Sequence, residues 1–436
     1  MSQPLSRRNF VIGSSAALAV SSAAEVTSAA VPAEEVMGPL LGHVDDTTAH
    51  FWARIASGGE YTLELRTVGD GSQPVTSVAR FTERADFTGH WSFADLQPAT
   101  KYRYRLLGTG GEIEGHFHTA PSPAVPSKVS LVLGSCATED EGSRGVWRRI
   151  LAEKVDGLVL CGDTPYIDST DLTKQRQRYR AFSAVPEFQG IAKSLPVWGT
   201  WDDHDFGKND ADGRLKGKEN ALQAFKEYRA NANFGENGVG IFTKFRFGPV
   251  EVFLIDARWF ANTGPSPVDE KKPTLLGKAQ FDWLLGSLKA STSPWKVLLT
   301  GIIWDAKTNG EKDHWETYAH ERRAIFDFIR QEKINGVVLF GGDIHVTRVL
   351  RYDAEKTVGY PLYQFISSPI HDRILPKLNN PHPDLIHSAV KPHTFLKLTC
   401  DSTVEDPTLT ARFLNSDGDL LFEEIKLSLK QTSHAV

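Results

Sequence analysis

A series of short apolar segments, each followed directly by glycine or by polar residues, restricts the fold of this chain more than any other feature. Amphipathic segments of helical length lie between several of them. The apolar segments are Ser130–Leu133, Gly157–Leu160, Leu195–Trp198, Val250–Ile255, Lys296–Thr300 and Gly336–Phe340, and the amphipathic ones are Gly217–Asn231, Leu276–Ala290 and Glu316–Lys333. This alternation predicts buried strands covered by helices, which is an α/β (α+β) fold.

Residues that can bind metal ions or phosphate follow most of these predicted strands. Strand ends in α/β proteins converge on one crevice, where ligands bind, so we expect these side chains to meet. They are Cys136 after the first strand, Asp163 and Tyr166 after the second, Asp203, His204 and Asp205 after the third, Asp256 and Arg258 after the fourth, and Asp343 and His345 after the last. One such loop would mean little, but the ordered set predicts a shared site.

The third of these loops, TWDDHDFGKND (Thr200–Asp210), carries an unusual density of acidic residues. Neighbouring carboxylates repel one another, which costs free energy unless a positive charge lies among them. A solvated surface loop is the alternative interpretation. Because the other strand ends also carry ligand-type residues, we favour a cation site.

The N-terminus resembles an export signal. Ser6–Gly13 (SRRNFVIG) holds the paired Arg7 and Arg8, and a mildly apolar run follows before small residues. We expect residues 1–33 to be a twin-arginine signal, read by the twin-arginine export machinery and removed from a periplasmic or secreted protein. The apolar run is shorter than the roughly 20 residues of a transmembrane helix, so stable membrane insertion is not expected.

Charge and cysteine content exclude some classes of protein. The formal net charge of −5 over 436 residues argues against a specific nucleic-acid binder. Three cysteines in an exported chain do not make a disulfide scaffold. We expect Cys161 and Cys400 to pack inside strands, and the chain to be a monomer.

The chain divides by pattern into an all-β part and an α/β part. Residues 36–120 are expected to form an immunoglobulin- or fibronectin-like β-sandwich, because alternating segments such as Ala49–Ile55 are separated by turn residues. A proline-containing linker follows at residues 121–128, and residues 129–432 form the predicted catalytic domain. Its last part reads as strands at Thr394–Cys400, Leu409–Leu414 and Leu420–Leu427.

The motif order resembles a known family. GDTPY, then DDHD, then GGDIH, is similar to the metallophosphoesterase series, and G-D-x-x-Y is similar to purple acid phosphatases, whose tyrosine binds iron(III). The opening GSC, the W-D-D-H-D form and G-D-x-H resemble the alkaline phosphatase D family. This resemblance implies two packed mixed sheets flanked by helices, preceded by a small β-sandwich.

The resemblance also implies the metals. Cys136, Asp163, Tyr166 and His345 would surround iron (Fe³⁺). Asp163, Asp203 and Asp343 would form an oxygen-rich second position, for which the resemblance implies calcium. The simpler alternatives are a buried thiol, a helix-capping aspartate and a packed tyrosine. The segment Lys296–Asp305 lacks the histidine that the wider superfamily supplies there, which disfavours zinc and leaves Trp304 and Asp305 without a role.

The expected reaction is hydrolysis of small-molecule phosphate mono- or diesters by metal-activated water, for phosphate scavenging. The resemblance implies that His204 contacts the scissile phosphate and assists the leaving oxygen, with Asp205 fixing its orientation. Arg258 is either a phosphate fork or an ion-pair partner of Asp256. A phosphodiesterase specific for phospholipids or nucleotides is the main alternative, and a non-catalytic exported binding protein is a more distant one.

Overall fold

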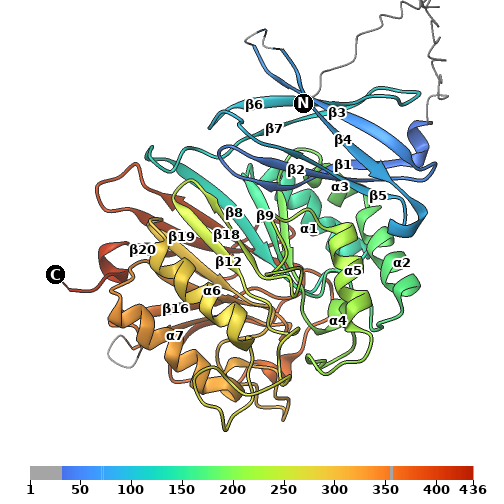
Figure 1. The fold of residues 1–436 in the computed structure, drawn as a ribbon. Coiled ribbons are helices and arrows are strands. Elements are labelled where there is room, and N and C mark those ends of the chain that lie inside the picture. The colour runs from blue at the N-terminus through green and yellow to red at the C-terminus, as the bar shows by residue number, and fades with distance from the viewer. Residues whose placement is uncertain (1–31, 70, 72, 354–356, 436) are drawn as a thin grey trace, which may run out of the picture. The chain divides into compact units, whose positions relative to one another are not determined.

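The structure is a computed structural model that describes residues 32–435, except residues 70, 72 and 354–356. Nearly all of the predicted export signal therefore lies outside the described residues. Two mixed sheets form the centre (Figure 1). The six-stranded sheet runs in the order β10 (Val197–Thr200), β9 (Gly157–Cys161), β8 (Lys128–Gly134), β18 (Thr394–Asp401), β19 (Thr408–Asn415), β20 (Ile425–Ser428). The seven-stranded sheet runs in the order β11 (Thr243–Phe247), β12 (Val250–Leu254), β13 (Trp295–Leu299), β14 (Val337–Gly341), β16 (Leu362–Ile366), β15 (Thr347–Tyr352), β17 (Leu385–Ala389).

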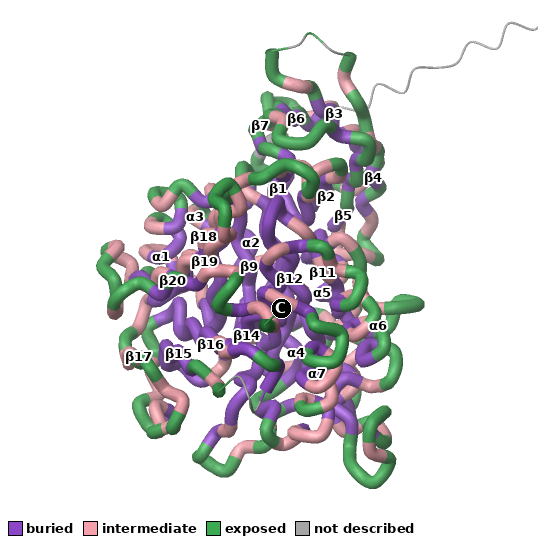
Figure 2. The backbone as a smooth tube through the Cα atoms, turned by 90° about the vertical axis from the view of Figure 1, so that its left-hand side faces the viewer, coloured by how far each residue is buried: buried purple, intermediate pink, exposed green. Residues whose placement is uncertain are grey.

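The two sheets pack face to face because their strands alternate between two apolar faces. In β9, Val159 and Cys161 lie in the cluster between the sheets, whereas Leu158 and Leu160 lie in the cluster on the outer face. Side chains along a strand point alternately to opposite faces, so a strand that is apolar throughout must be covered on both. Figure 2 shows the resulting buried run through β9, β12 and β14.

Helices cover the outer faces of both sheets. Helices α1 (Glu141–Ala152), α2 (Leu172–Ser183), α3 (Pro186–Ala192) and α5 (Lys218–Tyr228) share the outer cluster of the six-stranded sheet. Helices α6 (Gly277–Ala290) and α7 (Ala319–Gln331) do so on the seven-stranded sheet. A single turn, α4 (Asp203–Phe206), follows β10. Fully burying one large apolar side chain contributes about 1.5–3 kcal/mol, so these clusters dominate the stability of the fold.

The edges of the two sheets meet through an aromatic pair. The ring of Trp198 in β10 stacks on that of Phe245 in β11, with centroids 3.8 Å apart and planes nearly parallel. Both side chains are buried. Strands β10 and β11 are edge strands of their sheets, so this pair packs one edge of the six-stranded sheet against one edge of the seven-stranded sheet.

Seven strands between Val36 and His118 form an N-terminal all-β region. One sheet has the order β1 (Val36–Val44), β2 (Ala49–Ile55), β5 (Thr88–Phe93), and the other has the order β4 (Val75–Phe81), β3 (Gly59–Thr67), β6 (Lys101–Leu106), β7 (Ile113–His118). Phe51, Trp91 and Tyr104 are part of the separate apolar core that these strands enclose. The predicted α/β (α+β) fold class, with an all-β region in front of it, is confirmed.

The N-terminal region holds one backbone segment of the larger part, residues 227–231, through its carbonyl groups. The Trp52 indole N–H donates to the Glu227 carbonyl at 2.6 Å, and the backbone N–H of His43 donates to the Ala230 carbonyl at 2.6 Å. The rings of His90 and His50 lie 3.0 and 3.1 Å from the carbonyls of Arg229 and Asn231. The N-terminal region therefore holds this segment in place.

The same segment reaches one strand-end loop and one strand that leads to another. The Arg229 guanidinium donates to the Thr164 carbonyl, beside Asp163. The Asn231 side chain donates to the Gly199 carbonyl at 2.7 Å and accepts the Gly199 N–H at 3.1 Å. Residues 227–231 thus connect the N-terminal region to the loop after β9 and to β10 itself.

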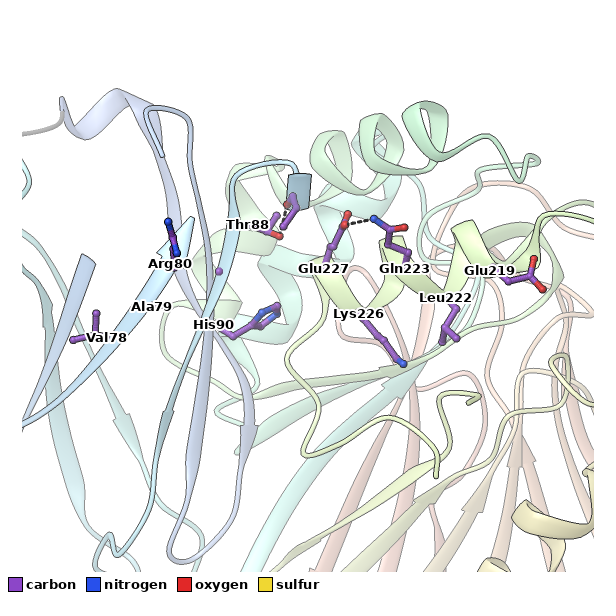
Figure 3. Close-up of a pocket in the computed structure, with 12 residues that line it drawn as sticks. Val78, Ala79, Arg80, Thr88, His90, Glu219, Leu222, Gln223, Lys226 and Glu227 are labelled. Atoms are coloured by element: carbon purple, nitrogen blue, oxygen red, sulfur yellow. Dashed lines mark hydrogen bonds between the residues drawn. The ribbon is translucent and has the colours of Figure 1, made fainter. Parts of the chain in front are cut away.

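A hollow of about 680 Å³ lies beside this junction, between β4–β5 and α5 (Figure 3). Its wall combines apolar Val78 and Leu222 with charged Arg80, Glu219 and Lys226. None of the predicted site residues lines it. Among the described residues, no helix is both long and apolar enough to cross a membrane.

Several sequence-based element boundaries differ from the structure. The strand predicted at Leu420–Leu427 is limited to β20, because Leu421 and Phe422 instead pack as loop residues against the core between the sheets. The helix predicted at Glu316–Lys333 is divided into a 3₁₀ turn, Trp315–Tyr318, and α7. Strands β11, β15, β16 and β17 were not predicted; in β16 the buried Gln364 lies within the apolar run and donates to Asp305 at 2.8 Å.

Candidate active site

Four of the predicted ligands occupy a backbone conformation that side chains normally avoid. The φ angles are 59° at Cys136, 52° at Asp163, 69° at Asp343 and 52° at His345. A left-handed conformation costs a residue with a Cβ roughly 1–2 kcal/mol. Residues held in such conformations concentrate at functional sites, where the surrounding structure imposes them. The loops after β8, β9 and β14 all carry this feature.

Glycine is required where the loop after β9 leaves the sheet. Gly162 has φ +88°, and a Cβ at this position would lie 2.5 Å from the Cβ of Asp202. The loops after β9 and β10 therefore approach one another so closely that only a residue without a side chain fits. This close approach brings Asp163 next to the acidic loop.

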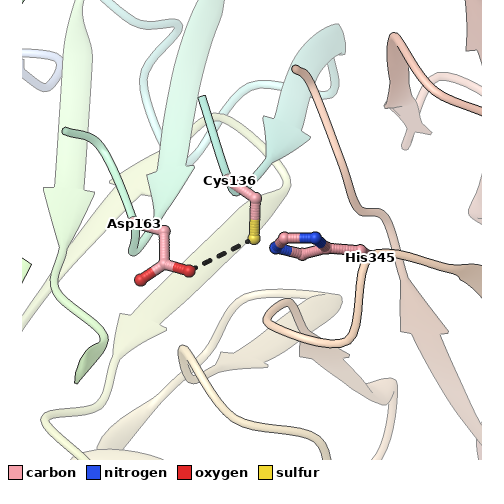
Figure 4. A group of neighbouring side chains, drawn as sticks. All are labelled: Cys136, Asp163 and His345. Carbon is pink, nitrogen blue, oxygen red and sulfur yellow. Dashed lines mark hydrogen bonds between the residues drawn. The ribbon is translucent and has the colours of Figure 1, made fainter. Parts of the chain in front are cut away.

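The structure brings Cys136, Asp163 and His345 together in a buried group (Figure 4). One ligand atom from each lies within 4.8 Å of the other two, and Cys136 Sγ is 3.5 Å from Asp163 Oδ2. Tyr166 joins them, because its hydroxyl oxygen lies 2.9 Å from His345 Nε2. The four residues predicted to surround one metal thus come from three separate loops to one place.

This group is electrostatically unbalanced by itself. Burial and the repulsion of Asp203 and Asp202 raise the pKa of Asp163 well above its usual value. Burial and the neighbouring Asp163 charge likewise raise the pKa of the Cys136 thiol. Within residues 32–435, apart from the undescribed gaps, no lysine or arginine forms an ion pair with Asp163. A bound cation would favour the ionised form of both groups, so the set fits a metal ion.

Asp203 lies on the other side of Asp163. Its two carboxylate oxygens accept backbone N–H groups, from His204 at 3.0 Å and from Asp210 at 2.6 Å. Two further groups have ligand atoms within 4.8 Å of one another, namely Asp163–Asp203–His204 and Asp203–Asp210–Asp313. Asp203 is therefore central to an oxygen-rich region that adjoins the cysteine group.

His204 is partly exposed to solvent, with 19 % of its side chain accessible. Its Nδ1 lies 2.5 Å from Asp168 Oδ1, and its ring lies beside that of Tyr166. The predicted partner, Asp205, does not contact it. Asp205 instead accepts the N–H of Asp202 at 2.5 Å as part of a capping box of α4, because its carboxylate turns back toward the start of the helix.

Arg258 is buried, with 2 % of its side chain exposed, and its guanidinium is already paired. It donates to Asp202 Oδ1 at 2.6 Å and to Asp313 Oδ2 at 3.0 Å. The expected ion pair with Asp256 is not formed. Asp256 accepts the Trp201 indole N–H at 2.7 Å and the backbone N–H of Arg258 at 3.0 Å, so it fixes the loop backbone.

Two residues that the sequence left without a role belong to the core. Trp304 stacks on Trp315, with ring centroids 4.2 Å apart, and donates to the Phe340 carbonyl. Asp305 pairs with Arg348 at 3.3 Å. Cys161 and Cys400 are buried in β9 and β18, as expected, and neither forms a disulfide.

Three residues that the sequence reasoning missed contact the site. Asp168 meets His204, as described. His371 Nε2 lies 3.0 Å from the Tyr166 hydroxyl. Lys307 Nζ lies 2.5 Å from Asp343 Oδ2. Asp168 lies two residues after GDTPY, and Lys307 follows the strand that lacks the expected histidine, so loop position was the available signal for both.

A hollow of about 510 Å³ opens beside the acidic side of the site. Asp210, Arg258 and Asp313 line it, together with apolar Leu275 and Tyr318. The hollow is large enough to receive a small organic group attached to a phosphate bound at the site.

Comparison with known protein families agrees with this geometry. The model of the family described as "PhoD-like phosphatase" matches residues 131–399, more than half of the chain. The chain belongs to this family. The match begins in β8 and ends in β18, so it contains all of the loops that carry the predicted site residues.

A curated relative of the family is alkaline phosphatase D of Bacillus subtilis (strain 168). It is 27 % identical to this chain over 318 residues, which are 60 % of this chain and 54 % of the relative. The aligned region thus spans about half the length of that relative.

Solved structures show the same fold. "Structure of PhoD" matches with a TM-score of 0.75 at 19 % identity, covering 92 % of this chain and 90 % of that one. The purple acid phosphatase PPD1 from yellow lupin (Lupinus luteus) seeds matches with a TM-score of 0.69 at 15 % identity, covering 90 % of this chain and 74 % of that one. At these identities the likeness shows that the fold is shared.

Proposed function

We propose that this chain is an exported, metal-dependent phosphoesterase that hydrolyses small-molecule phosphate esters. The observation that carries the proposal is the meeting of Cys136, Asp163, Tyr166 and His345 at one buried place, next to the partly exposed His204. A buried set of acidic ligands beside a positioned imidazole is suited to hydrolysis assisted by a metal ion. Membership of the PhoD-like phosphatase family supports the same reaction class.

We assign trivalent iron to the cysteine group. Thiolate, phenolate and carboxylate are anionic ligands, and the absence of a basic partner for Asp163 among the described residues leaves their charge for a metal to balance. When bound there, the ion would act as a Lewis acid toward water and the phosphoryl oxygens. His345 can serve as the neutral ligand, since burial lowers the pKa of its imidazole to about 3.

The carboxylates assigned to calcium fit that ion less well than the cysteine group fits iron. Both oxygens of Asp203 accept backbone N–H groups, and Asp343 faces the Lys307 ammonium at 2.5 Å. Calcium binds six to eight oxygens and is repelled by a neighbouring ammonium. No step of the reaction is therefore assigned to a calcium ion.

His204 is the residue we assign to the leaving group. It lies at the accessible edge of the site, and the Asp168 carboxylate at Nδ1 holds the ring so that Nε2 is available to the substrate. A proton on Nε2 can pass to the departing alkoxide oxygen, which would otherwise leave as a strong base. The organic part of the ester would occupy the neighbouring hollow lined by Leu275 and Tyr318.

The reaction is tested with two chromogenic substrates, an aryl phosphate monoester and a bis-aryl diester. Hydrolysis of either supports the proposal, and the ratio of the two rates separates a phosphatase from the alternative phosphodiesterase. Phosphatidylcholine and a cyclic nucleotide then test for lipid or nucleotide diester specificity. A purified, iron-loaded protein that hydrolyses none of them would instead agree with a non-catalytic binding protein.

We further propose twin-arginine export and a role in phosphate scavenging, motivated by Arg7 and Arg8 in SRRNF. Replacing both arginines by lysine should leave the precursor in the cytoplasm, because this route reads the arginine pair itself. Cell fractionation followed by immunoblotting measures the outcome. Unchanged export of the double variant would contradict the assignment.

A further inference from the structure

Lys307 lies in the loop after β13 and is buried, with 1 % of its side chain exposed. Its ammonium contacts three carboxylates, Asp343 at 2.5 Å, Asp313 at 2.7 Å and Glu311 at 2.9 Å. A buried ammonium is stable only when opposite charges and hydrogen bonds replace its water. These three acids provide that replacement, so the position of Lys307 is set by charge pairing on three sides.

Arg258 repeats this arrangement a short distance away. Its guanidinium pairs with Asp202 at 2.5 Å and with Asp313 at 3.0 Å, and it lies 3.8 Å from Asp203. Asp313 therefore bridges the two basic side chains, through one oxygen to each. Together Lys307 and Arg258 place two fixed positive charges among the carboxylates of the oxygen-rich region.

The oxygen-rich region and the cysteine group differ in the source of their positive charge. Asp163 has no basic partner among the described residues, whereas Asp343 and Asp203 face Lys307 and Arg258. A divalent ion next to Asp343 would meet the Lys307 ammonium at close range, which is repulsive in a site with little water. The chain itself thus supplies the positive charge next to Asp343 and near Asp203.

We propose that the Lys307 ammonium, fixed by Asp313 and Glu311 beside Asp343, replaces a second metal ion on this side of the site. The site then works with the metal of the cysteine group alone and does not require calcium. Lys307 acts there through its charge alone, because its three N–H groups face three carboxylates. This inference rests on the proposed phosphoesterase function.

Calcium content and activity test the proposal together. Iron-loaded wild-type protein is dialysed against EGTA and then equilibrated with calcium at about 1 mM, the weak end of known extracellular calcium sites. We expect no bound calcium per chain and no change in aryl phosphate turnover or in the thermal unfolding temperature. One calcium per chain, together with loss of turnover in EGTA, would overturn the proposal; the Asp203–Asp210–Asp313 group is where that ion would bind.

Lys307→Met removes the charge and keeps the length of the side chain. The three acids are then unpaired, so we expect this variant to lose turnover, to bind calcium, and to unfold at a higher temperature when calcium is added. Lys278→Met is the control, since Lys278 is an exposed lysine of α6 that pairs with Asp282 at 2.6 Å, and it should match the wild type in all three measurements. A Lys307→Met protein that behaves like this control would contradict the proposal.

The calcium measurement remains decisive if Lys307→Met does not fold, because it is made on the wild type. Failure of the two proposals is also distinguishable. A wild type without bound calcium that hydrolyses neither aryl ester contradicts the phosphoesterase function alone. A wild type that hydrolyses them only with bound calcium contradicts the replacement of the second metal alone.

Discussion

On one side of the candidate site, Cys136, Asp163 and His345 lie together in a buried group with no lysine or arginine paired to Asp163 among the described residues. On the other side, Asp343 lies against Lys307, and Asp203 lies near Arg258. Both sides collect acidic groups at the ends of strands. They differ in whether the sequence also supplies the positive charge.

The comparison separates two ways to stabilise buried carboxylates. An imported ion can be exchanged or removed, and it brings Lewis acidity that no side chain has. A lysine is present whenever the chain is folded, and it brings a fixed charge without any free coordination position. A site that uses one of each would be sensitive to iron supply and insensitive to calcium supply.

The largest expected effect comes from removing the shared acid of the cysteine group. Asp163→Asn replaces a carboxylate by a neutral amide, which binds a trivalent ion poorly, so iron content and turnover should both fall to background. Elemental analysis and the aryl phosphate assay measure this. Full iron content in the variant would show that Asp163 is not a ligand and would remove the basis of the comparison.

His204→Ala should leave iron in place and slow hydrolysis by roughly 10²–10⁴-fold, the usual range for a positioned acid or base. The loss should be larger for esters with poor leaving groups, because those depend more on proton donation. His116→Ala, at an exposed position of β7, is the control for loss of an imidazole elsewhere. Undiminished turnover of His204→Ala would rule out the proposed role.

A third prediction uses a buried lysine that has no carboxylate contact like that of Lys307. Lys296 Nζ donates to the carbonyls of Ser293 at 2.6 Å and Asn335 at 3.1 Å, and burial lowers its pKa from 10.5 to about 8. Between these two pH values the unfolded chain binds the extra proton, so the free energy of unfolding rises with pH. The rise should reach about 3 kcal/mol relative to Lys296→Met.

Urea unfolding of both proteins at pH 7.5, 9 and 10.5 measures this difference. Subtracting the variant removes the contribution of all other titrating lysines. A difference that stays constant with pH would show that Lys296 is protonated in both the folded and the unfolded state. Burial without a carboxylate partner would then not lower the pKa of a lysine in this protein. Burial and carboxylate pairing act in opposite directions on these two lysines, since the pKa of Lys307 is raised by Asp343 and Asp313 despite burial.

The smallest expected effect concerns Asp168, which acts through His204. Asp168→Asn should lower kcat by roughly 10–100-fold, the usual cost of losing a carboxylate behind a functional imidazole, with KM and iron content unchanged. Asp171→Asn is the matched control, because Asp171 caps α2 and asparagine caps equally well. A change in KM with constant kcat would show that Asp168 binds substrate rather than orienting the histidine.

The strand ends were predictable because they follow from pattern alone. Apolar runs give the strands, and α/β topology brings their carboxyl ends together, so Cys136, Asp163 and His345 could be grouped from the sequence. The direction of each side chain was not predictable. Asp205 is next to His204 in the sequence, and Asp168 comes from the loop after β9. The carboxylate of Asp205 caps α4, so the Asp168 carboxylate is the one that contacts the imidazole of His204.

Lys307 and His371 were missed for a different reason. Lys307 carries no metal-ligand chemistry, and a lone lysine in a loop is ordinarily solvated, so nothing local marks it as buried. His371 follows β16, whose apolar run is broken by the buried Gln364, and its loop was therefore not recognised as another strand end. Tertiary contacts decide both cases, and these are not encoded in short-range pattern.

The bonds between the N-terminal region and residues 227–231 limit how this protein can be shortened. A fragment starting at Lys128 would leave the carbonyls of Glu227 and Ala230 without their donors Trp52 and His43, and the loosened segment includes Arg229, which bonds the Thr164 carbonyl beside Asp163. Neither protein engineering nor domain shuffling in evolution can thus remove the all-β region without disturbing residues 227–231. A gene that lost it would need compensating changes around Arg229 before its catalytic half could be inherited alone.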